Sequence, residues 1–489
     1  MRILGVFVAF SLAVGLGTVL ALQVHSKKSS GHHPSLTLYY SDGKTVLWHD
    51  ANPAVEPTTQ PSNAPYFVDL VRTELLQTFG DKYYQKGAWN VTTSLDGGLQ
   101  ASAEKLAASN LSAISASTNG KADEVATVLE DVTTGQIKAL VGGADRSNSD
   151  HGQINYTTTK VSPGTSIMPF DYAALIDRTS DVGAGTALSD TLGPLQGWSC
   201  NNRSIPANGG NCLYNADFLF LGPMSLRYAL ATGRNVPAAQ AGLRVGISQL
   251  TDFVGQMGAT AGYHCYQATD LAPSSVSQCY GSAALGDGAY LTLRDATHAF
   301  ATLANGGQKL PQTTLVSATL NGKSVRSWQQ PPSTQVVRPD TAYIINGIMS
   351  DPTAGTLPGS CSDTNCTAGA NDAKFQRYNG WQFAEDLGNS MLGTSAMSAS
   401  WSAKYAVVAW AGNHSQTNRS FTPGTTTTQL LPLVRGLMQA AHTGKSPAGW
   451  QQPSDLQKLP ASPFPAGSVT AGPTTDWYPS WYRQPAAAN

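Results

Sequence analysis

The strongest hydrophobic pattern lies at the start of the chain, where residues 3–24 form an apolar run without a charged side chain. At ~1.5 Å per residue, a helix of this length would span a hydrocarbon core of ~30 Å. A cleaved signal peptide is the alternative, because Val19-Leu20-Ala21 resembles a cleavage site. We expect an uncleaved, single-pass membrane anchor over residues 1–28.

Beyond the anchor, residues 29–62 are polar and rich in proline, which is typical of a linker. Helical spacing of apolar residues begins at Tyr66 in "YFVDLVRTELLQTFG". The next run, "WNVTTSLDGGLQASAEKLAASNL", predicts a short strand, an Asp-Gly-Gly turn and a helix. These elements define a segment over residues 63–120.

Two β-rich runs around Gly135, "EVATVLEDVTTGQIKALVGG", predict a hairpin. Another strand, "KYAVVAWAG", lies far downstream, and "TQLLPLVRGLMQAAHTG" predicts a last amphipathic helix that ends at Gly444. Strands at both ends of a helical region favour an α+β domain over residues 121–445, with its two ends meeting in one sheet. Residues 446–489 are rich in Pro, Ala, Gly and Ser and predict a disordered tail.

The charge content argues against one class of function. Only 12% of the 489 residues are charged, about half of the usual ~25%, and the formal net charge is −1. Nucleic-acid binders usually carry a basic patch, and Lys and Arg form no such cluster in this sequence. We therefore expect no nucleic-acid partner.

The six cysteines lie in neighbouring pairs: Cys200 with Cys212, Cys265 with Cys279, and Cys361 with Cys366. Local pairs favour three short-loop disulfides in an oxidising compartment, although this pairing rests on proximity alone. A zinc site is the weaker alternative, because no Cys-x-x-Cys occurs and the histidines are scattered. We expect no metal and no cofactor, and we place the bulk of the chain outside the cytoplasm.

Six segments resemble, in the same order, the transpeptidase domain of bifunctional (class A) penicillin-binding proteins and the linker before it. They are "APYFVDLVRTELLQTFG", "ATVLEDVTTGQIKALVGG" with "SPGTSIMPFDYAALID", "SLRYALATGRNVPAAQAGLRVG", "LGDGAYLTLRDATHAFATLANGG", "VVRPDTAYIINGIMSD" and "LGTSAMSASWSAKYAVVAWAGN". The resemblance runs from about residue 63 to 445. It implies the α+β fold of serine β-lactamases and transpeptidases, with a central antiparallel sheet and helices on both faces.

The first motif of that family is S-x-x-K at the start of a helix, where the lysine amine can take the proton of the serine nucleophile. Residues i and i+3 share a helix face, which brings the two groups together. The resemblance aligns Thr165 with the serine and Met168 with the lysine. A methionine sulfur cannot act as a general base. Ser166 is a fallback nucleophile, but its i+3 partner is Pro169.

The second motif, S-x-N, aligns with Gly233-Arg234-Asn235, so the asparagine remains and the hydroxyl is lost. The third, K-T-G, aligns with Thr394-Ser395-Ala396, where the substrate-binding cation and the glycine are lost. The loss of a general base alone typically removes ~10²–10⁴ of the rate. The resemblance therefore implies that Thr165, Met168, Gly233, Asn235, Thr394, Ser395 and Ala396 are motif-equivalent positions without activity.

Class A proteins also carry a glycosyltransferase domain between anchor and linker. Only about 40 residues separate the anchor from the resemblance in this sequence, so we expect that domain to be absent. We predict a membrane-anchored, non-catalytic domain that binds a peptidoglycan stem peptide or a cell-wall synthesis protein. Two alternatives remain: an active D,D-transpeptidase or carboxypeptidase with a displaced nucleophile or base, and a structural domain without a ligand.

Overall fold

The computed structural model describes residues 34–51, 64–205, 209–258, 264–265, 281–355, 377–390, 393–415, 425–462 and 473–485. The expected anchor over residues 1–28 lies outside the described residues. Within the stretches given above, no helix has both the length and the apolar character needed to cross a bilayer.

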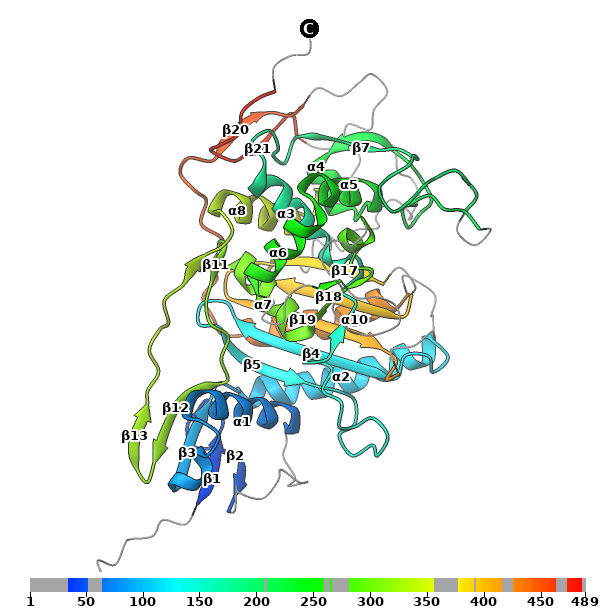
Figure 1. Ribbon diagram of the computed structural model, residues 1–489. Helices are drawn as coiled ribbons and strands as arrows, with labels where there is room; N and C mark the ends of the chain where they lie inside the picture. The colour runs from blue at the N-terminus through cyan, green and yellow to red at the C-terminus, as the bar shows by residue number, and fades with distance from the viewer. Residues whose placement is uncertain are drawn as a thin grey trace, which may run out of the picture.

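The central sheet has five antiparallel strands in the order β17-β18-β19-β4-β5 (Figure 1). Their bounds are β4 Glu124–Asp131, β5 Gln136–Val141, β17 Ala384–Asn389, β18 Ser395–Trp401 and β19 Tyr405–Gly412. Strand β4 pairs with β19 along its whole length. The Thr127 hydroxyl also donates to the Val408 carbonyl, 281 residues further along the chain. This pairing confirms the prediction that both ends of the domain meet in one sheet.

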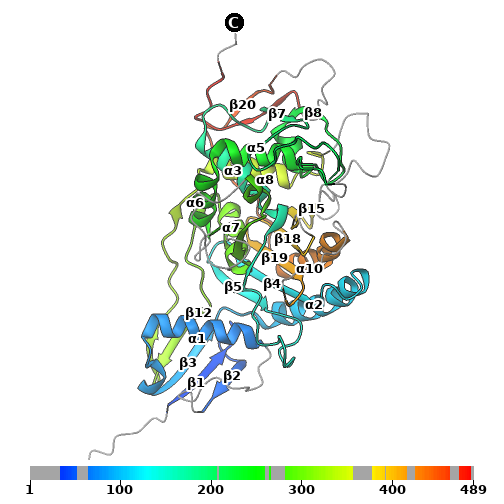
Figure 2. The same ribbon diagram turned by 45° about the vertical axis from the view of Figure 1, so that its right-hand side comes forward.

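Helices cover both faces of the central sheet (Figure 2). One face packs on α2 Gly97–Ser117 and α10 Thr425–His442, with which it shares one hydrophobic cluster. The opposite face packs on helices that belong to a second, larger cluster. The helices on that side are α3 Met168–Arg178, α4 Leu226–Ala231, α5 Asn235–Val245, α6 Ile247–Met257, α7 Leu293–Ala304 and α8 Pro339–Met349. The expected α+β fold with a doubly covered sheet is confirmed.

The outer edge of β5 is protected by a side chain. The buried Gln100 amide accepts from the Leu140 N–H at 2.8 Å and donates to the Leu140 carbonyl at 2.9 Å. The predicted turn before α2 also forms, and the Asp96 carboxylate caps that helix by accepting from the Gly98 and Leu99 N–H groups. Satisfied edge groups do not offer a template for pairing with another chain.

A second five-stranded sheet lies beneath the central one, in the order β13-β12-β3-β1-β2 (Figure 1). Its strands are β1 Ser35–Tyr39, β2 Val46–Asp50, β3 Ala88–Thr93, β12 Leu315–Leu320 and β13 Lys323–Arg326, and helix α1 spans Pro65–Phe79. The structure corrects the expectation that residues 29–62 are a linker throughout, because residues 34–51 form the hairpin β1–β2. Leu36 and Leu38 alternate with more exposed residues and are fully buried.

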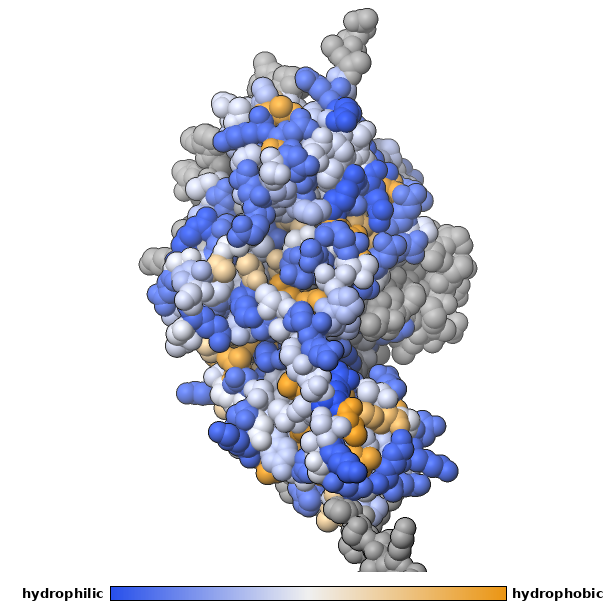
Figure 3. Space-filling model, turned by 90° about the vertical axis from the view of Figure 1, so that its left-hand side faces the viewer, coloured by the Kyte–Doolittle hydropathy of each residue, from blue (hydrophilic) through white to orange (hydrophobic). Residues whose placement is uncertain are grey.

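Short elements connect these layers. They are the 3₁₀ turns η1 Tyr83–Lys86, η2 Gly164–Ile167 and η5 Gly281–Leu285, and the strands β6 Lys160–Val161, β7 Ala187–Asp190, β8 Gly222–Ser225, β9 His264–Cys265, β10 Ala289–Thr292, β11 Gln308–Lys309, β14 Thr334–Gln335, β15 Arg377–Tyr378 and β16 Trp381–Gln382. The face in Figure 3 is mostly hydrophilic, with pale as well as deep blue residues, which agrees with a surface made largely of uncharged polar side chains.

The structure also corrects the prediction of a disordered tail from residue 446. Strands β20 Gln457–Pro460 and β21 Thr475–Tyr478 form an antiparallel hairpin at the top of the molecule (Figure 1). Asp476, 2% exposed, pairs with Arg227 through two hydrogen bonds of 2.8 and 2.6 Å, 249 residues away in sequence. A buried, bidentate ion pair therefore attaches the C-terminal segment to α4.

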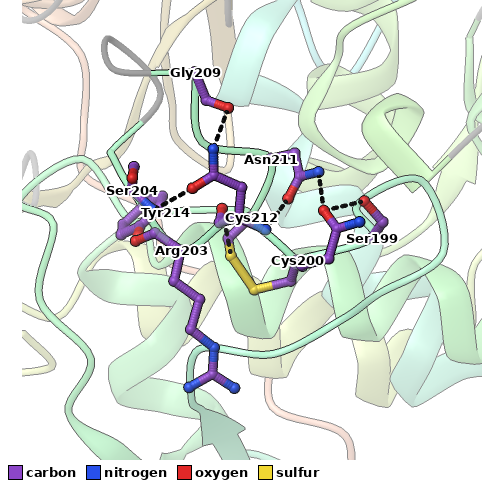
Figure 4. Close-up of a disulfide and its surroundings, with 10 residues drawn as sticks. Ser199, Cys200, Arg203, Ser204, Gly209, Asn211, Cys212 and Tyr214 are labelled. Atoms are coloured by element: carbon purple, nitrogen blue, oxygen red, sulfur yellow. Dashed lines mark hydrogen bonds between the residues drawn. A yellow bond between two sulfur atoms is a disulfide. The ribbon is translucent and has the colours of Figure 1, made fainter.

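One of the three expected disulfides lies within the described residues. Cys200 and Cys212 are bonded, as predicted from their proximity (Figure 4). The loop they close also has hydrogen bonds of its own: the Asn202 N–H donates to the Asn211 side-chain oxygen at 2.9 Å, and the Asn202 amide donates to the Gly209 carbonyl at 3.0 Å. The side chains of the other four cysteines lie outside the described part of the chain.

Removal of the Asp476 carboxylate tests the attachment of the C-terminal segment. We expect Asp476→Ala to lower the free energy of unfolding by about 3 kcal/mol, because the Arg227 guanidinium would stay buried and, among the described residues, would keep Asp351 as its one ion-pair partner. Urea denaturation measures the change. The exposed Asp455 lies in the same segment, and Asp455→Ala should change stability by no more than about 0.5 kcal/mol. Equal stability of the two variants would contradict this role.

Loss of the Cys200–Cys212 disulfide should lower the stability of the protein, because the unfolded chain gains conformational entropy. With a sequence separation of 12 residues, the loop entropy predicts a destabilisation of about 3 kcal/mol for Cys200→Ser combined with Cys212→Ser. Denaturation with and without a reducing agent measures this difference. A double variant that unfolds at the same urea concentration as the oxidised wild type would show that the loop's hydrogen bonds suffice.

Candidate functional site

The candidate site lies where the 3₁₀ turn η2 meets β17, an edge strand of the central sheet. Two glycines permit this contact. A Cβ at Gly388 would overlap the backbone nitrogen of Ser166, and a Cβ at Gly164 would overlap the Asn389 carbonyl group. Gly164 also has a φ of +57°, a region that favours glycine. Because neither residue has a side chain, the backbones of strand and turn approach closely.

Thr165 is the half-buried residue of η2 that faces this junction. Its hydroxyl oxygen accepts a hydrogen bond from the Asn389 N–H at 3.3 Å. A backbone N–H in this position could stabilise negative charge that develops beside the hydroxyl, as an oxyanion-hole donor does. The structure therefore brings together the Thr165 alcohol and a hydrogen-bond donor, the Asn389 N–H.

The neighbouring hydroxyl is engaged elsewhere. Ser166 is 1% exposed, and its hydroxyl donates to the Pro163 carbonyl at 2.7 Å. Ser162, on the other side of the turn, donates to the Gly286 carbonyl at 2.6 Å. A hydroxyl that donates its single hydrogen to a backbone carbonyl and lies buried is a poor nucleophile, so the geometry favours Thr165 over Ser166.

Met168 opens helix α3, three residues after Thr165. It is 2% exposed and belongs to the larger hydrophobic cluster. Nucleophilic catalysis by the Thr165 hydroxyl would need a nearby base to take its proton, and a methionine side chain cannot do this. Met168 instead contributes apolar surface to the larger hydrophobic cluster.

The second predicted motif forms the connection between α4 and α5. The Arg234 guanidinium is buried and pairs with Asp190 at 2.8 Å and with Asp217 at 2.6 Å. The Asn235 amide donates to the Tyr214 carbonyl at 2.8 Å. Gly233 has a φ of +61°, and a Cβ there would meet no atom within 4 Å. Arg234, the central residue of the motif, thus holds the connection in place. The space beside the Gly233 Cα is not filled by another described atom.

The third predicted motif does not lie on the strand that touches Thr165. Thr394 is in the turn before β18, and Ser395 and Ala396 begin β18, which lies between β17 and β19. The Ser390 hydroxyl accepts from the Thr394 and Ser395 N–H groups and closes this turn. The Ser395 hydroxyl does reach the segment before η2, where it donates to the Ser162 carbonyl at 3.4 Å. The backbone that bonds to Thr165 is that of β17, which sequence reasoning missed.

Asp386 is the functional candidate on β17. It lies two residues before Gly388, so both point to the face of the sheet that packs on η2 and α8. The side chain is 9% exposed, its Oδ2 atom has no hydrogen-bond partner among the described residues, and burial raises the pKa of Asp386 to about 7. Its neighbour Glu385 points to the opposite face and pairs with Arg435 at 2.7 Å. The signal available in the sequence was Gly388, a glycine near the end of a strand and two residues after Asp386.

A second buried acid lies on α3. Neither carboxyl oxygen of Asp171 has a hydrogen-bond partner among the described residues, and burial raises the pKa of Asp171 well above its usual value. A protonated Asp171 avoids the cost of a buried charge. Within the described chain, no group of three or more His, Cys, Asp or Glu residues could hold a metal ion.

The sequence of the chain is similar to those of penicillin-binding proteins 1A and 1B. It is 27% identical to penicillin-binding protein 1B of Vibrio cholerae over 264 residues, which cover 54% of this chain and 31% of that protein. It is 22% identical to penicillin-binding protein 1A of Clostridium perfringens over 414 residues, 82% of this chain and 46% of that protein. The chain thus spans less than half the length of these relatives. No model of a protein family matches it.

Solved structures show the same fold. Penicillin-binding protein 1A from Haemophilus influenzae superimposes with a TM-score of 0.68 and 16% identity, over 87% of this chain and 77% of that one. The penicillin-binding protein PonA1 from Mycobacterium tuberculosis gives a TM-score of 0.61 and 18% identity, over 83% and 96%. A five-stranded antiparallel sheet with helices on both faces is thus the fold that this chain shares with the solved penicillin-binding proteins. More specifically, the chain contains a penicillin-binding protein transpeptidase-like domain.

Asp386→Asn tests the burial of the acid at the site. In the folded protein the carboxyl keeps its proton up to about pH 7, whereas in the unfolded chain it loses it near 3.8. The wild type therefore loses stability as the pH rises from about 4 to 7, at up to about 1.4 kcal/mol per pH unit. We expect the asparagine variant to match the wild type near pH 4 and to be more stable above pH 7.

Urea denaturation at a series of pH values measures this difference, and the exposed Asp81→Asn serves as the control. A stability difference between Asp386→Asn and wild type that does not change with pH would show that the Asp386 carboxyl titrates normally.

Proposed function

We propose that the protein is a non-catalytic, penicillin-binding-protein-like domain that acts in cell-wall biogenesis by binding a peptidoglycan stem peptide or a wall-synthesis partner. The observation that carries this proposal is the environment of Thr165. The position three residues later holds the buried Met168, and the strand beside the hydroxyl presents Asp386 in place of a cation. The frame of an acyl-transfer site is present, but the amine groups that would run the reaction are replaced.

The proposal includes an assignment of the motif positions. We infer that Thr165, Met168, Gly233 and Asn235 correspond to the first two motifs. Since the backbone of β17 bonds to Thr165 and passes against Ser166, we infer that the third corresponds to Asp386-Leu387-Gly388 rather than to Thr394-Ser395-Ala396. This assignment retains the glycine that a close approach needs and changes the lysine to an acid.

Acyl transfer from Thr165 is the second candidate function. It is favoured by Asp386, because a carboxylate with a pKa of about 7 on the same face as Gly388 is suited to general base catalysis near neutral pH. In this reaction the Asp386 carboxylate would accept the Thr165 proton, and the Thr165 oxygen would attack the acyl carbon of a peptide bond. The C–N bond would then break, with the proton passing from Asp386 to the leaving amine, and Thr165 would carry the acyl group as an ester.

Covalent labelling with a fluorescent penicillin, read by intact mass, separates the two functions. PonA1 from Mycobacterium tuberculosis, whose structure has been solved in complex with penicillin V, is the positive control. We expect no adduct on this protein after prolonged incubation. An adduct that is lost in both Thr165→Ala and Asp386→Asn, but kept in Ser166→Ala, would establish catalysis and overturn the non-catalytic proposal.

Binding is tested separately by sedimentation with purified peptidoglycan. We expect the full chain to sediment with intact peptidoglycan and to be displaced into the supernatant by an excess of soluble stem peptide. A protein that stays in the supernatant without competitor would contradict peptidoglycan binding and leave a wall-synthesis protein as the partner to be sought by cross-linking.

We also propose that residues 1–28 anchor the protein in the cell membrane with the domain outside the cytoplasm. The apolar run and the Cys200–Cys212 disulfide support this placement, because disulfides persist in oxidising compartments.

A further inference from the structure

A cleft of about 350 Å³ lies between α8 and the C-terminal hairpin β20–β21, on elements that do not carry Thr165. This volume is within the range of small-molecule sites. Two aromatic rings form one corner: Trp477 of β21 and Tyr343 of α8 meet edge to face, with their centroids 6.4 Å apart. Both side chains are partly exposed, so their rings are accessible from the cleft.

The cleft contains a fixed set of charges. Arg227 bonds to both oxygens of Asp476 and donates to Asp351 at 3.3 Å, so one buried guanidinium holds two carboxylates in place. Asp351 is itself oriented further, because it accepts from the Thr353 N–H and hydroxyl at 2.9 and 2.7 Å. Hydrogen-bonding groups that are already ordered lose little entropy when a ligand binds.

Two further cations lie at the rim. Lys458 pairs with Trp477 across the hairpin, and its ammonium lies 5.4 Å from the Trp477 ring centroid. Arg377 is exposed and donates to the Ser350 carbonyl at 3.3 Å. With Arg227, the cleft holds three cationic and two anionic side chains, which leaves one net positive charge.

This combination indicates the chemical class of the ligand. A sugar ring presents an apolar C–H face, which packs on an aromatic ring, and hydroxyls at its edge that both donate and accept hydrogen bonds. Trp477 and Tyr343 suit the apolar face. Beside them the partly exposed Asp351 carboxylate offers an acceptor, and the exposed Lys458 and Arg377 offer donors. A simple phosphate would use the cations alone and leave the aromatic corner without a partner.

We propose that the cleft between α8 and the β20–β21 hairpin binds an acidic saccharide, whose ring packs against Trp477 and whose carboxylate pairs with Lys458 and Arg377. This site is independent of the function proposed for the Thr165 region, and Thr165→Ala should bind the saccharide as the wild type does.

Isothermal titration calorimetry of the full chain tests the proposal with three probes. A hyaluronan tetrasaccharide is acidic, chitotetraose is a neutral N-acetylglucosamine chain of the same length, and inorganic phosphate supplies an anion alone. We expect the acidic tetrasaccharide to bind about fivefold more tightly than chitotetraose, as one exposed charge pair implies, and phosphate not to compete at equal concentration.

Matched variants locate the site. Lys458 is exposed, so Lys458→Gln should fold normally and weaken binding of the acidic tetrasaccharide about fivefold, while the remote, exposed Lys105→Gln should not change it. Trp477→Phe, checked for an unchanged melting temperature, should weaken both oligosaccharides. The proposal is overturned by no binding of the acidic tetrasaccharide, by equal affinity in Lys458→Gln and wild type, or by phosphate competing as well as the saccharide.

Discussion

The close backbone contact between η2 and β17 is the constraint on which the candidate site depends. Gly164 and Gly388 leave no Cβ between the turn and the strand, so the Asn389 N–H reaches the Thr165 hydroxyl. Any other residue at Gly388 would push the start of α3 away from the sheet. The contact is a matter of backbone geometry alone, and for this reason it can persist when the side chains around it change.

Three side chains on β17 and α3 are buried near this contact: Met168, Asp171 and Asp386. Met168 adds apolar volume to the core, whereas a lysine at that place would bury a charge. Asp386 and Asp171 are buried acids, and burial raises the pKa of each, so both favour the neutral form. At neutral pH, Met168 carries no charge, the Asp171 carboxyl keeps its proton, and Asp386 is near the midpoint of its titration. None of these three side chains supplies the positive charge that would attract a carboxylate.

The sequence predicted the parts of the fold that have a local pattern. The β4–β5 hairpin and β19 are apolar runs bounded by turns, and their pairing was foreseen. The β1–β2 hairpin was missed, although Leu36 and Leu38 alternate correctly, because the run is short and precedes a proline-rich stretch. The C-terminal hairpin was missed because its attachments join residues far apart in sequence, which no local pattern reveals. Examples are the Arg227–Asp476 ion pair, across 249 residues, and the hydrogen bond from the Ala184 N–H to the Trp477 carbonyl. The strand at the site was missed because a single glycine, Gly388, is its only local signal, and the backbone contact that this glycine permits appears only in the folded chain.

The two sheets make the domain a single folding unit in spite of its layered shape. Strand β3 lies between β1, which precedes it closely in sequence, and β12, whose residues come more than two hundred positions later. The β1–β2 hairpin therefore depends on β3, and β3 is completed only once the chain has passed through the helical region. The β4–β19 and Arg227–Asp476 contacts have the same long range. Because such contacts must close large loops before they stabilise the protein, we infer that folding is slow and that the candidate site forms only when the C-terminal third of the chain is in place.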